Sequence, residues 1–394
     1  MTRLRILCLL LFIVSDSRSH GGERSDSAAE SRRIGWPLIE GIVNGTAVPI
    51  MVADTGSQAC IVDQTWAHQN LKGFEVSRRR LISLAGASEV DVFGRVPFSL
   101  KNGPEKPMDI FTGNLSPVSH ATDCSFAIAG MPYLRNHIAK FSASRGCELL
   151  TELPAMAPET FVVPLRNGQT RPEIQIDFPT IGNRWILIDT GGMGSLALSK
   201  DRIGMLNRTG HILKSSSGRG FDTEGRSFVS QYYLVRRFGI GDIQFLNVDV
   251  RESQVETIGM GVLRHFDMIL DFSNDRAFLT FIGNNRVYSS YHRASGTGGY
   301  VSKNGRIRIL DVWEMTPASE IGLKTTDEIT MIDGLNPASL GYWQLQEILS
   351  QAGKTIPLTV LRDGKEMSMK MTLRHSVPFP PDWPPEKPEF NPEP

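Results

Sequence analysis

The sequence predicts a mainly β protein with two similar β-barrel units, related by a pseudo-two-fold axis, and a small α+β domain after them. Three observations support this fold class. An apolar run ends in Asp-Thr-Gly at residues 50–56 and again at 185–191. Each turn is followed at a similar distance by a matching glycine segment. After Gly283 the pattern changes to glycine-rich turns, short strands and one amphipathic helix.

The repeat is defined by spacing as well as by composition. Gly130 follows Asp54 by 76 residues, and Gly259 follows Asp189 by 70 residues. Both glycines open the pattern Gly-Met-x-x-Leu-Arg after an apolar segment. Self-similarity of this kind indicates an internal duplication. We therefore expect one unit at residues 36–153 and a second at 160–286, joined by a proline-containing link.

Composition places the chain among ordinary globular proteins. It has 394 residues, 40% hydrophobic and 21% charged, with a formal net charge of zero. A chain of this length is expected to form two or three domains. The absence of net charge gives no reason to expect a nucleic-acid partner. No Cys/His cluster has the spacing of a metal site, so we expect no metal and no cofactor.

The N-terminus has the pattern of an export signal. Arg3 and Arg5 precede an apolar run at 6–14, which is too short to span a bilayer but suits a secretory signal at residues 1–19. A buried N-terminal helix is the alternative. Residues 20–35 are rich in Gly, Ser, Glu and Arg and are predicted to be a disordered leader. We expect a periplasmic or secreted protein without a membrane span in the mature chain.

The cysteines do not define a disulfide framework. Removal of the signal also removes Cys8 and leaves Cys60, Cys124 and Cys147. An odd number cannot pair completely. A bridge between Cys124 and Cys147 stays open, because sequence alone does not give their separation.

Each Asp-Thr-Gly turn is expected to end a β-hairpin. Residues 37–43 form a predicted strand, Asn44-Gly45 a turn, and 47–53 the returning strand, which delivers Asp54. Residues 174–178 and 185–188 repeat this arrangement and deliver Asp189.

This duplicated pattern resembles the aspartic peptidases of the pepsin and retropepsin type. The resemblance covers residues 36–286, as two fused units of retropepsin size. It implies that Asp54 and Asp189 face each other as a catalytic pair within one chain, although pairing between chains stays open. Two carboxyl groups at such a distance share a proton, so one acts as general base on a water and the other polarises the scissile carbonyl.

The resemblance also assigns supporting roles to the residues around the two aspartates. Thr55 and Thr190 would bond across the interface, and Gly56 and Gly191 would let backbone approach the carboxylates. Ser57 follows the first turn, whereas Gly192, without a hydroxyl, follows the second. We therefore predict an asymmetric pair in which the Ser57 hydroxyl bonds Asp54 and Asp54 holds the negative charge more often.

The sequence departs from pepsin-like enzymes in the region that would cover the site. No tyrosine precedes Tyr133, so the flap tyrosine of those enzymes is missing. Residues 84–94 and 215–225 are the flap candidates. Ordinary surface loops are the alternative reading of both segments.

Residues 298–375 resemble PDZ domains of the kind attached to bacterial envelope proteases. The similarity lies in Pro-Ala-x-x-x-Gly-Leu at 317–323, Asp-x-Ile at 327–329 and Ile-Asp-Gly at 332–334. Thr326 stands where these domains usually have glycine. The resemblance implies a groove for a C-terminal or extended peptide. The candidate carboxylate-binding loop is Gly298, Gly299, Tyr300 and Val301; the alternative is a domain that only packs on the preceding units.

The last segment, residues 376–394, contains eight prolines in 19 residues and is predicted to be an extended tail without a core. The leading function predicted from the sequence is an exported aspartic endopeptidase that acts on peptides or proteins, with the PDZ domain docking a substrate or partner. An inactive peptidase-like scaffold that binds peptides through its PDZ domain is the alternative. Substrate, pH optimum and zymogen activation stay open.

Overall fold

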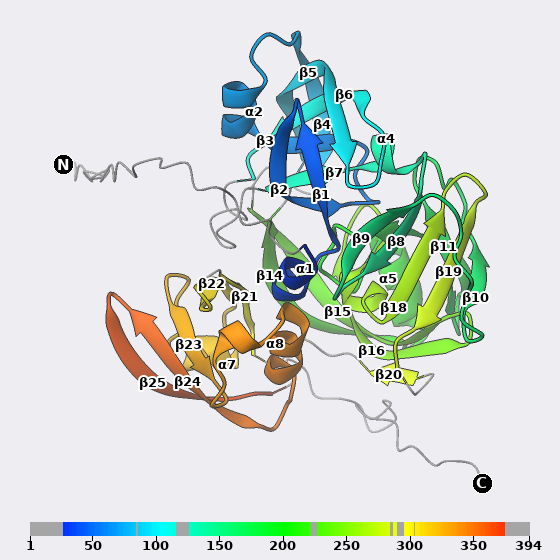
Figure 1. The fold of residues 1–394 in the computed structure, drawn as a ribbon. Coiled ribbons are helices and arrows are strands. Elements are labelled where there is room, and N and C mark those ends of the chain that lie inside the picture. The colour runs from blue at the N-terminus through cyan, green and yellow to red at the C-terminus, as the bar shows by residue number, and fades with distance from the viewer. Residues whose placement is uncertain are drawn as a thin grey trace, which may run out of the picture.

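The computed structural model describes residues 27–83, 86–115, 126–221, 227–283, 287–289, 295–302 and 304–374. The predicted signal, the whole of the predicted tail and Cys124 lie outside these residues. Within them, no helix is both long enough and apolar enough to cross a bilayer. Strands dominate, as predicted, and they form four sheets (Figure 1).

The first sheet closes on itself. Its strands follow the order β1-β2-β7-β3-β6-β5-β4, and β1 also pairs with β5. The predicted hairpin is confirmed: β1 and β2 pair antiparallel around Asn44-Gly45, both with positive φ (50° and 70°). The elements of this unit are β1 (Leu38–Val43), β2 (Thr46–Ala53), β3 (Cys60–Asp63), α2 (Gln64–Asn70), β4 (Val76–Ser83), β5 (Gly86–Leu100), β6 (Lys106–Gly113), β7 (Phe126–Ala129) and α4 (Met131–Leu134).

A second sheet repeats the same strand pairing. β12 pairs antiparallel with β11 and parallel with β17, as β2 does with β1 and β7. Its order is β14-β15-β11-β12-β17-β13-β16-β20, and β15 also pairs with β16. The elements are β11 (Glu173–Phe178), β12 (Gly182–Asp189), β13 (Leu196–Leu198), α5 (Lys200–Arg208), β14 (Ile212–Phe221), β15 (Ser227–Ile240), β16 (Ile243–Glu252), β17 (Thr257–Gly259), α6 (Met260–Leu263) and β20 (Val287–Ser289).

A third sheet joins the two units. Its order is β10-β19-β18-β8-β9, so the pairing of β18 with β8 connects strands from both halves of the chain. A single cluster of buried apolar side chains extends through both units. The two units therefore form one body. The strands are β8 (Ile138–Ser142), β9 (Gly146–Leu150), β10 (Phe161–Pro164), β18 (Phe266–Asp271) and β19 (Arg276–Phe281).

The C-terminal domain has its own sheet and its own core. The sheet order is β21-β22-β23-β24-β25, and a separate apolar cluster lies beneath it. The predicted helix at 342–352 is confirmed but ends at Leu349, and the predicted hairpin around Asp363-Gly364 is confirmed. The elements are β21 (Thr297–Val301), β22 (Ile307–Val312), α7 (Pro317–Glu320), β23 (Glu328–Ile332), η1 (Pro337–Ser339), α8 (Tyr342–Leu349), β24 (Thr355–Arg362) and β25 (Lys365–Thr372).

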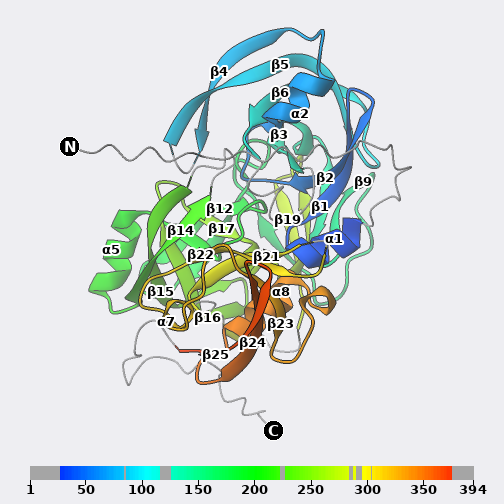
Figure 2. The same ribbon diagram turned by 90° about the vertical axis from the view of Figure 1, so that its left-hand side faces the viewer.

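The prediction of a disordered leader is wrong for its second half. Residues Ser27–Ile34 form helix α1, which packs against β1, β9, α8 and β21 (Figures 1 and 2). Ile34 is fully buried, and the buried Ser31 hydroxyl accepts a hydrogen bond from the Leu38 N–H at 3.1 Å. The polar composition of the segment concealed these two buried positions, whose contacts come from elements distant in sequence.

Candidate active site

The two Asp-Thr-Gly turns are held by the same strand arrangement. Asp54 follows β2 directly, and its N–H donates to the Ala129 carbonyl at the end of β7 (2.9 Å). Asp189 is the last residue of β12 and lies opposite Gly259 at the end of β17. Because each turn follows a strand that lies parallel to a buried neighbour, its position is determined by the sheet.

The two turns bond to each other through their threonines. The Thr55 N–H donates to Thr190 Oγ1 at 3.0 Å, and the Thr190 N–H donates to Thr55 Oγ1 at 3.2 Å. The Thr55 hydroxyl then donates to the Ile188 carbonyl at 2.7 Å, and the Thr190 hydroxyl to the Ala53 carbonyl at 2.6 Å. Both side chains are buried. Each hydroxyl thus connects the strand end of one unit to the turn of the other.

This cross-bonding brings the two carboxyl groups of one chain together. The Asp54 and Asp189 carboxyl groups lie close enough for each to affect the pKa of the other. A Cβ added to Gly56 would lie 2.6 Å from Asp189 Oδ1, and one added to Gly191 would lie 2.3 Å from Asp54 Oδ2. No larger residue fits at either position. The close approach predicted for Gly56 and Gly191 is therefore present, and each glycine faces the aspartate of the opposite turn.

Backbone N–H groups surround the carboxylates. Asp54 Oδ1 accepts from the N–H groups of Gly56 (2.8 Å) and Ser57 (3.1 Å). The N–H groups of Gly191 and Gly192 lower the pKa of Asp189, and the Gly192 N–H donates to the Asp189 backbone carbonyl at 3.2 Å. The expectation for the Ser57 side chain is wrong: its hydroxyl donates to the Ala59 carbonyl at 2.8 Å instead of to Asp54. That carbonyl lies two residues further along the same turn. It therefore accepts the hydrogen bond that was expected to go to the Asp54 carboxylate.

The electrostatic surroundings of the two aspartates differ. Burial and, after it, the charge of Asp189 raise the pKa of Asp54 to about 7. Burial also raises the pKa of Asp189, but the positive charge of Arg251 on β16 opposes that rise. A buried carboxyl next to a carboxylate favours its neutral form, whereas a neighbouring cation favours the ionised form. These surroundings favour the neutral form of Asp54 and the ionised form of Asp189, which is the reverse of the asymmetry expected from the Ser57 hydroxyl.

Steric crowding explains why glycine occupies both downstream positions, 130 and 259. A Cβ on Gly130 would lie 2.2 Å from the Ala59 carbonyl oxygen, and one on Gly259 would lie 2.4 Å from the Gly194 carbonyl oxygen. The next residues donate to the two turns, Met131 N–H to the Ser57 carbonyl (2.9 Å) and Met260 N–H to the Gly192 carbonyl (2.7 Å). The repeated Gly-Met pattern therefore encodes the packing of a short helix against each Asp-Thr-Gly turn.

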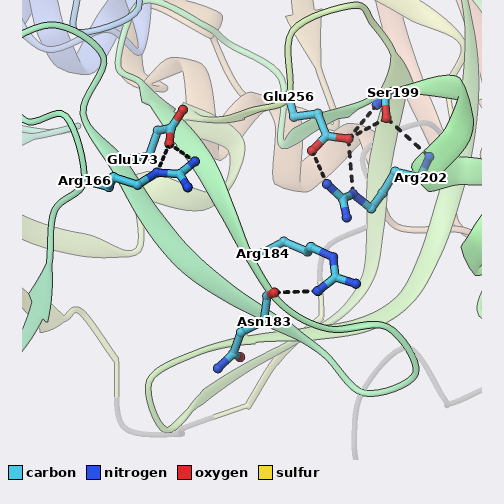
Figure 3. A network of polar contacts seen from close by, with 7 residues as sticks. All are labelled: Arg166, Glu173, Asn183, Arg184, Ser199, Arg202 and Glu256. Carbon is cyan, nitrogen blue, oxygen red and sulfur yellow. Dashed lines mark hydrogen bonds and ion pairs between the residues drawn. The ribbon is translucent and has the colours of Figure 1, made fainter.

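A polar network supports the strand beneath the second turn (Figure 3). The Glu256 carboxylate accepts from Arg202 Nη2 (2.8 Å) and from the Ser199 hydroxyl (2.6 Å), while the Glu256 carbonyl accepts from the Leu187 N–H (3.2 Å). Although burial acts in the opposite direction, the hydrogen bonds from Arg202 and Ser199 hold the pKa of Glu256 below its usual value. This network connects α5 to the strand that carries Asp189.

The two flap candidates lie on long hairpins. Strands β4 and β5 form one, and β14 and β15 form the other. Their tips, residues 84–85 and 222–226, lie outside the described residues. Both hairpins are visible in Figure 2, where β4 and β14 lie toward the left-hand side of the view.

The predicted carboxylate-binding loop of the C-terminal domain is wrong in its local structure. Gly298, Gly299, Tyr300 and Val301 belong to strand β21, which pairs with β22 at one edge of the sheet. The register between β21 and β22 shifts between Gly298 and Gly299, where Leu310 of β22 is the extra residue of a bulge, so the glycines lie in a paired strand instead of a loop. β21 also packs against α1.

Three residues near the turns were missed by the sequence analysis. Trp36 donates its indole N–H to the Gly191 carbonyl, Arg251 acts on Asp189, and the buried Arg264 lies 4.4 Å over the ring of Trp343. Arg264 is the last residue of the second Gly-Met-x-x-Leu-Arg pattern, but that pattern does not indicate its contact with Trp343. No pattern marks the other two, because they meet the second turn only through tertiary packing.

Comparison with known proteins identifies one part of the chain. The PDZ domain family matches residues 287–373, and this region is a PDZ domain. The match begins with β20, which pairs with β16 of the second unit, whereas the sheet of the PDZ domain itself starts at β21. No curated protein sequence matches the chain.

One solved structure with local similarity is an aminopeptidase N family protein from Idiomarina loihiensis. It is 20% identical over 21% of this chain and 13% of its own, with a TM-score of 0.18. The similarity is thus limited to a small part of that protein, and it supports no conclusion about the fold or activity of this chain.

Proposed function

We propose that this protein is an aspartic endopeptidase whose two retropepsin-like lobes, related by a pseudo-two-fold axis, form one catalytic site within a single chain. The observation that carries the proposal is the reciprocal bonding of Thr55 and Thr190 beneath two adjacent carboxyl groups, those of the buried Asp54 and the partly buried Asp189. Simple surface turns would have no reason to exclude side chains at Gly56 and Gly191. A shared proton between two carboxyl groups is the arrangement that aspartic peptidases use.

The surroundings of the pair assign the two roles. Asp54, whose pKa is raised to about 7, is the protonated partner and donates to the scissile carbonyl oxygen. Asp189, opposed to Arg251, is the ionised partner and removes a proton from a water molecule as its oxygen attacks the carbonyl carbon. The tetrahedral intermediate then breaks at the C–N bond, and a proton passes to the leaving amine. The products are a carboxylic acid and an amine, and no covalent intermediate forms.

The β4–β5 and β14–β15 hairpins are the proposed flaps over the substrate. Each extends from the barrel that carries one of the two turns. Hairpins that close over a substrate exclude water from the reaction and place the peptide bond against the carboxyl pair.

The PDZ domain is proposed to dock a peptide or a protein partner. β21 lies at a sheet edge, where an extended peptide adds as a further strand. Helix α1 packs against both β21 and α8, so a ligand at this edge would share the surface with the N-terminal segment of the chain. The apolar run at residues 6–14 is consistent with an exported protein, and export to the periplasm or outside the cell is part of the proposal.

The proposed activity is tested by cleavage of a peptide library from acid to neutral pH. Wild-type protein is compared with Asp54→Asn, Asp189→Asn and, as a matched control, Asp201→Asn on the exposed face of α5. Loss of either carboxylate of a catalytic pair reduces the rate by at least about a thousandfold. Cleavage that survives at either position would exclude the mechanism. Peptide binding by the PDZ domain without cleavage by the wild-type protein would favour the scaffold alternative.

A further inference from the structure

A tryptophan outside both Asp-Thr-Gly turns makes direct contact with the second one. Trp36 lies between α1 and β1, and its indole Nε1 donates to the Gly191 carbonyl at 2.8 Å. The side chain is buried, and its ring packs against Phe126 of β7 with 5.3 Å between the ring centroids. The ring is therefore fixed from one side by the first barrel while its polar edge reaches the turn of the second.

The contact acts on a peptide group that also bonds Asp189. The carbonyl of Gly191 and the N–H of Gly192 belong to one planar unit. Trp36 holds the carbonyl end, and at the other end the Gly192 N–H donates to the Asp189 backbone carbonyl at 3.2 Å and lowers the pKa of the Asp189 carboxyl. Because the unit is rigid, holding its carbonyl also orients its N–H. A hydrogen bond to the carbonyl further polarises the N–H and strengthens its electrostatic effect on Asp189.

The PDZ domain holds the residue that precedes Trp36. Trp343 on α8 donates its indole N–H to the Gly35 carbonyl at 3.1 Å. The packing there is close, since a Cβ added to Gly35 would lie 2.6 Å from the Tyr342 ring. In Figures 1 and 2, α8 lies next to α1, the helix that leads into Gly35.

A cation from the second barrel fixes the same side of α8. The Arg264 guanidinium lies 4.4 Å over the Trp343 ring, and the Glu347 carboxylate is 3.5 Å from it. The Arg264 side chain is 4% exposed, so these contacts form in a place from which water is largely excluded. A buried cation–π contact is worth more than an exposed one. The orientation of Trp343 is therefore fixed by the second barrel as well as by Gly35.

We infer that Trp36 is a positioning residue for the second Asp-Thr-Gly turn and that the PDZ domain, through Trp343, belongs to the structure that holds this turn in place. The inference rests on the proposed peptidase function for its catalytic consequence, but the contacts themselves do not depend on it. Two charged groups also act on Asp189, namely Asp54 and Arg251.

The first test needs no substrate. Hydrogen exchange of residues 189–194 is measured by mass spectrometry in the full chain for the wild type, Trp36→Phe and Trp343→Phe. Both substitutions keep an aromatic ring and remove the indole N–H. We expect exchange in this segment to accelerate about tenfold, as the loss of one hydrogen bond predicts. Trp66→Phe on α2, whose ring packs on the main apolar core, is the matched control and should leave the segment unchanged.

Unchanged exchange in both Trp36→Phe and Trp343→Phe would overturn the inference. Acceleration in Trp36→Phe alone would retain the role of Trp36 and remove that of the PDZ domain. Thermal unfolding of each variant, followed by circular dichroism, checks that the change is local. A protein that cleaves no peptide would refute the proposed function, and the exchange result would still decide the role of Trp36.

The second test measures the catalytic consequence. In Trp36→Phe, kcat should fall about tenfold while KM changes little, because the substrate does not touch the indole. The acid limb of the pH–rate profile should move to higher pH, since a Gly192 N–H that is less well oriented stabilises the charged form of Asp189 less. A uniform loss of activity without a shift of this limb would indicate general damage and contradict the positioning role.

Discussion

Thr55 and Thr190 each donate a hydroxyl to the other unit and accept the N–H of the other threonine, so four hydrogen bonds link the two turns through two side chains. The hydroxyls lie 3.3 Å apart, and both residues are almost completely buried. A hydroxyl at this position satisfies a carbonyl and an N–H that would otherwise be buried without partners.

The first prediction concerns this link. Replacement of either threonine by valine should lower the free energy of unfolding by about 2–4 kcal/mol, because two buried backbone groups lose their partners at once. Chemical denaturation monitored by circular dichroism measures the change. Thr55→Ser and Thr190→Ser keep the hydroxyl and should cost about 1 kcal/mol, the value of one methyl group. Equal losses for valine and serine would show that the hydrogen bonds do not stabilise the link.

The second prediction concerns Arg251. Its charge lowers the pKa of Asp189, so Arg251→Gln should raise that pKa and move the acid limb of the pH–rate profile to higher pH. A shift of about one pH unit is expected for the loss of one partly screened charge. Arg237→Gln, on the neighbouring strand β15, is the control for removal of a cation from the same sheet. An unchanged acid limb in Arg251→Gln would mean that Asp189 is not the partner that ionises first.

The third prediction uses the raised pKa of Asp54, about 7 against 3.8 for an unperturbed carboxyl. The folded state binds this proton more tightly than the unfolded state does. Stability contributed by the site is therefore present at low pH and decreases as pH rises from about 4 through 7. Asp54→Asn removes this loss and should stabilise the protein by roughly 2–4 kcal/mol at pH 8 but by little at pH 4. Melting temperatures at the two pH values test this, and stabilisation that does not depend on pH would contradict it.

The fourth prediction concerns the downstream glycines. Gly130→Ala and Gly259→Ala each place a methyl group within 2.4 Å of a backbone oxygen, so both should destabilise the fold by more than about 3 kcal/mol. Gly194→Ala is the matched control, because no atom lies within 4 Å of its added Cβ although it belongs to the same loop. Denaturation midpoints that were alike for all three variants would show that the close approach is not needed.

Much of the fold followed from local patterns. The strand, turn and strand that deliver Asp54 were predicted from alternating apolar residues around Asn44-Gly45, and positive φ values at both turn positions explain why those two residues stand there. Helices α2 and α5 were missed, although the side chains of Asp63 and Ser199 cap them. Both follow short buried strands without a long apolar period of their own, so periodicity did not identify them.

The candidate site, like the fold, has some features that the sequence predicts and others that it does not. The duplicated Asp-Thr-Gly turns and their downstream glycines are visible in the sequence because each depends on a few adjacent residues: a strand, a turn and a glycine that must pass close to backbone. From these alone, a hypothesis of paired carboxylates was possible. The role given to the Ser57 hydroxyl was wrong because a nearby backbone carbonyl competes for it, and only atomic positions decide such a competition.

What the sequence by itself determined is the repeat, the mainly β fold, the PDZ domain and the residues that form the two turns. Only the tertiary structure decided that Asp54 and Asp189 of one chain lie together, that Arg251 distinguishes them, and that Trp36 and Trp343 connect the PDZ domain to the second turn. The physical reason is the separation along the chain over which each kind of interaction acts. Strand periodicity and turn chemistry act over a few residues, whereas the charge, burial and hydrogen bonds of a carboxyl pair depend on groups that are distant in sequence and meet only when the sheets close.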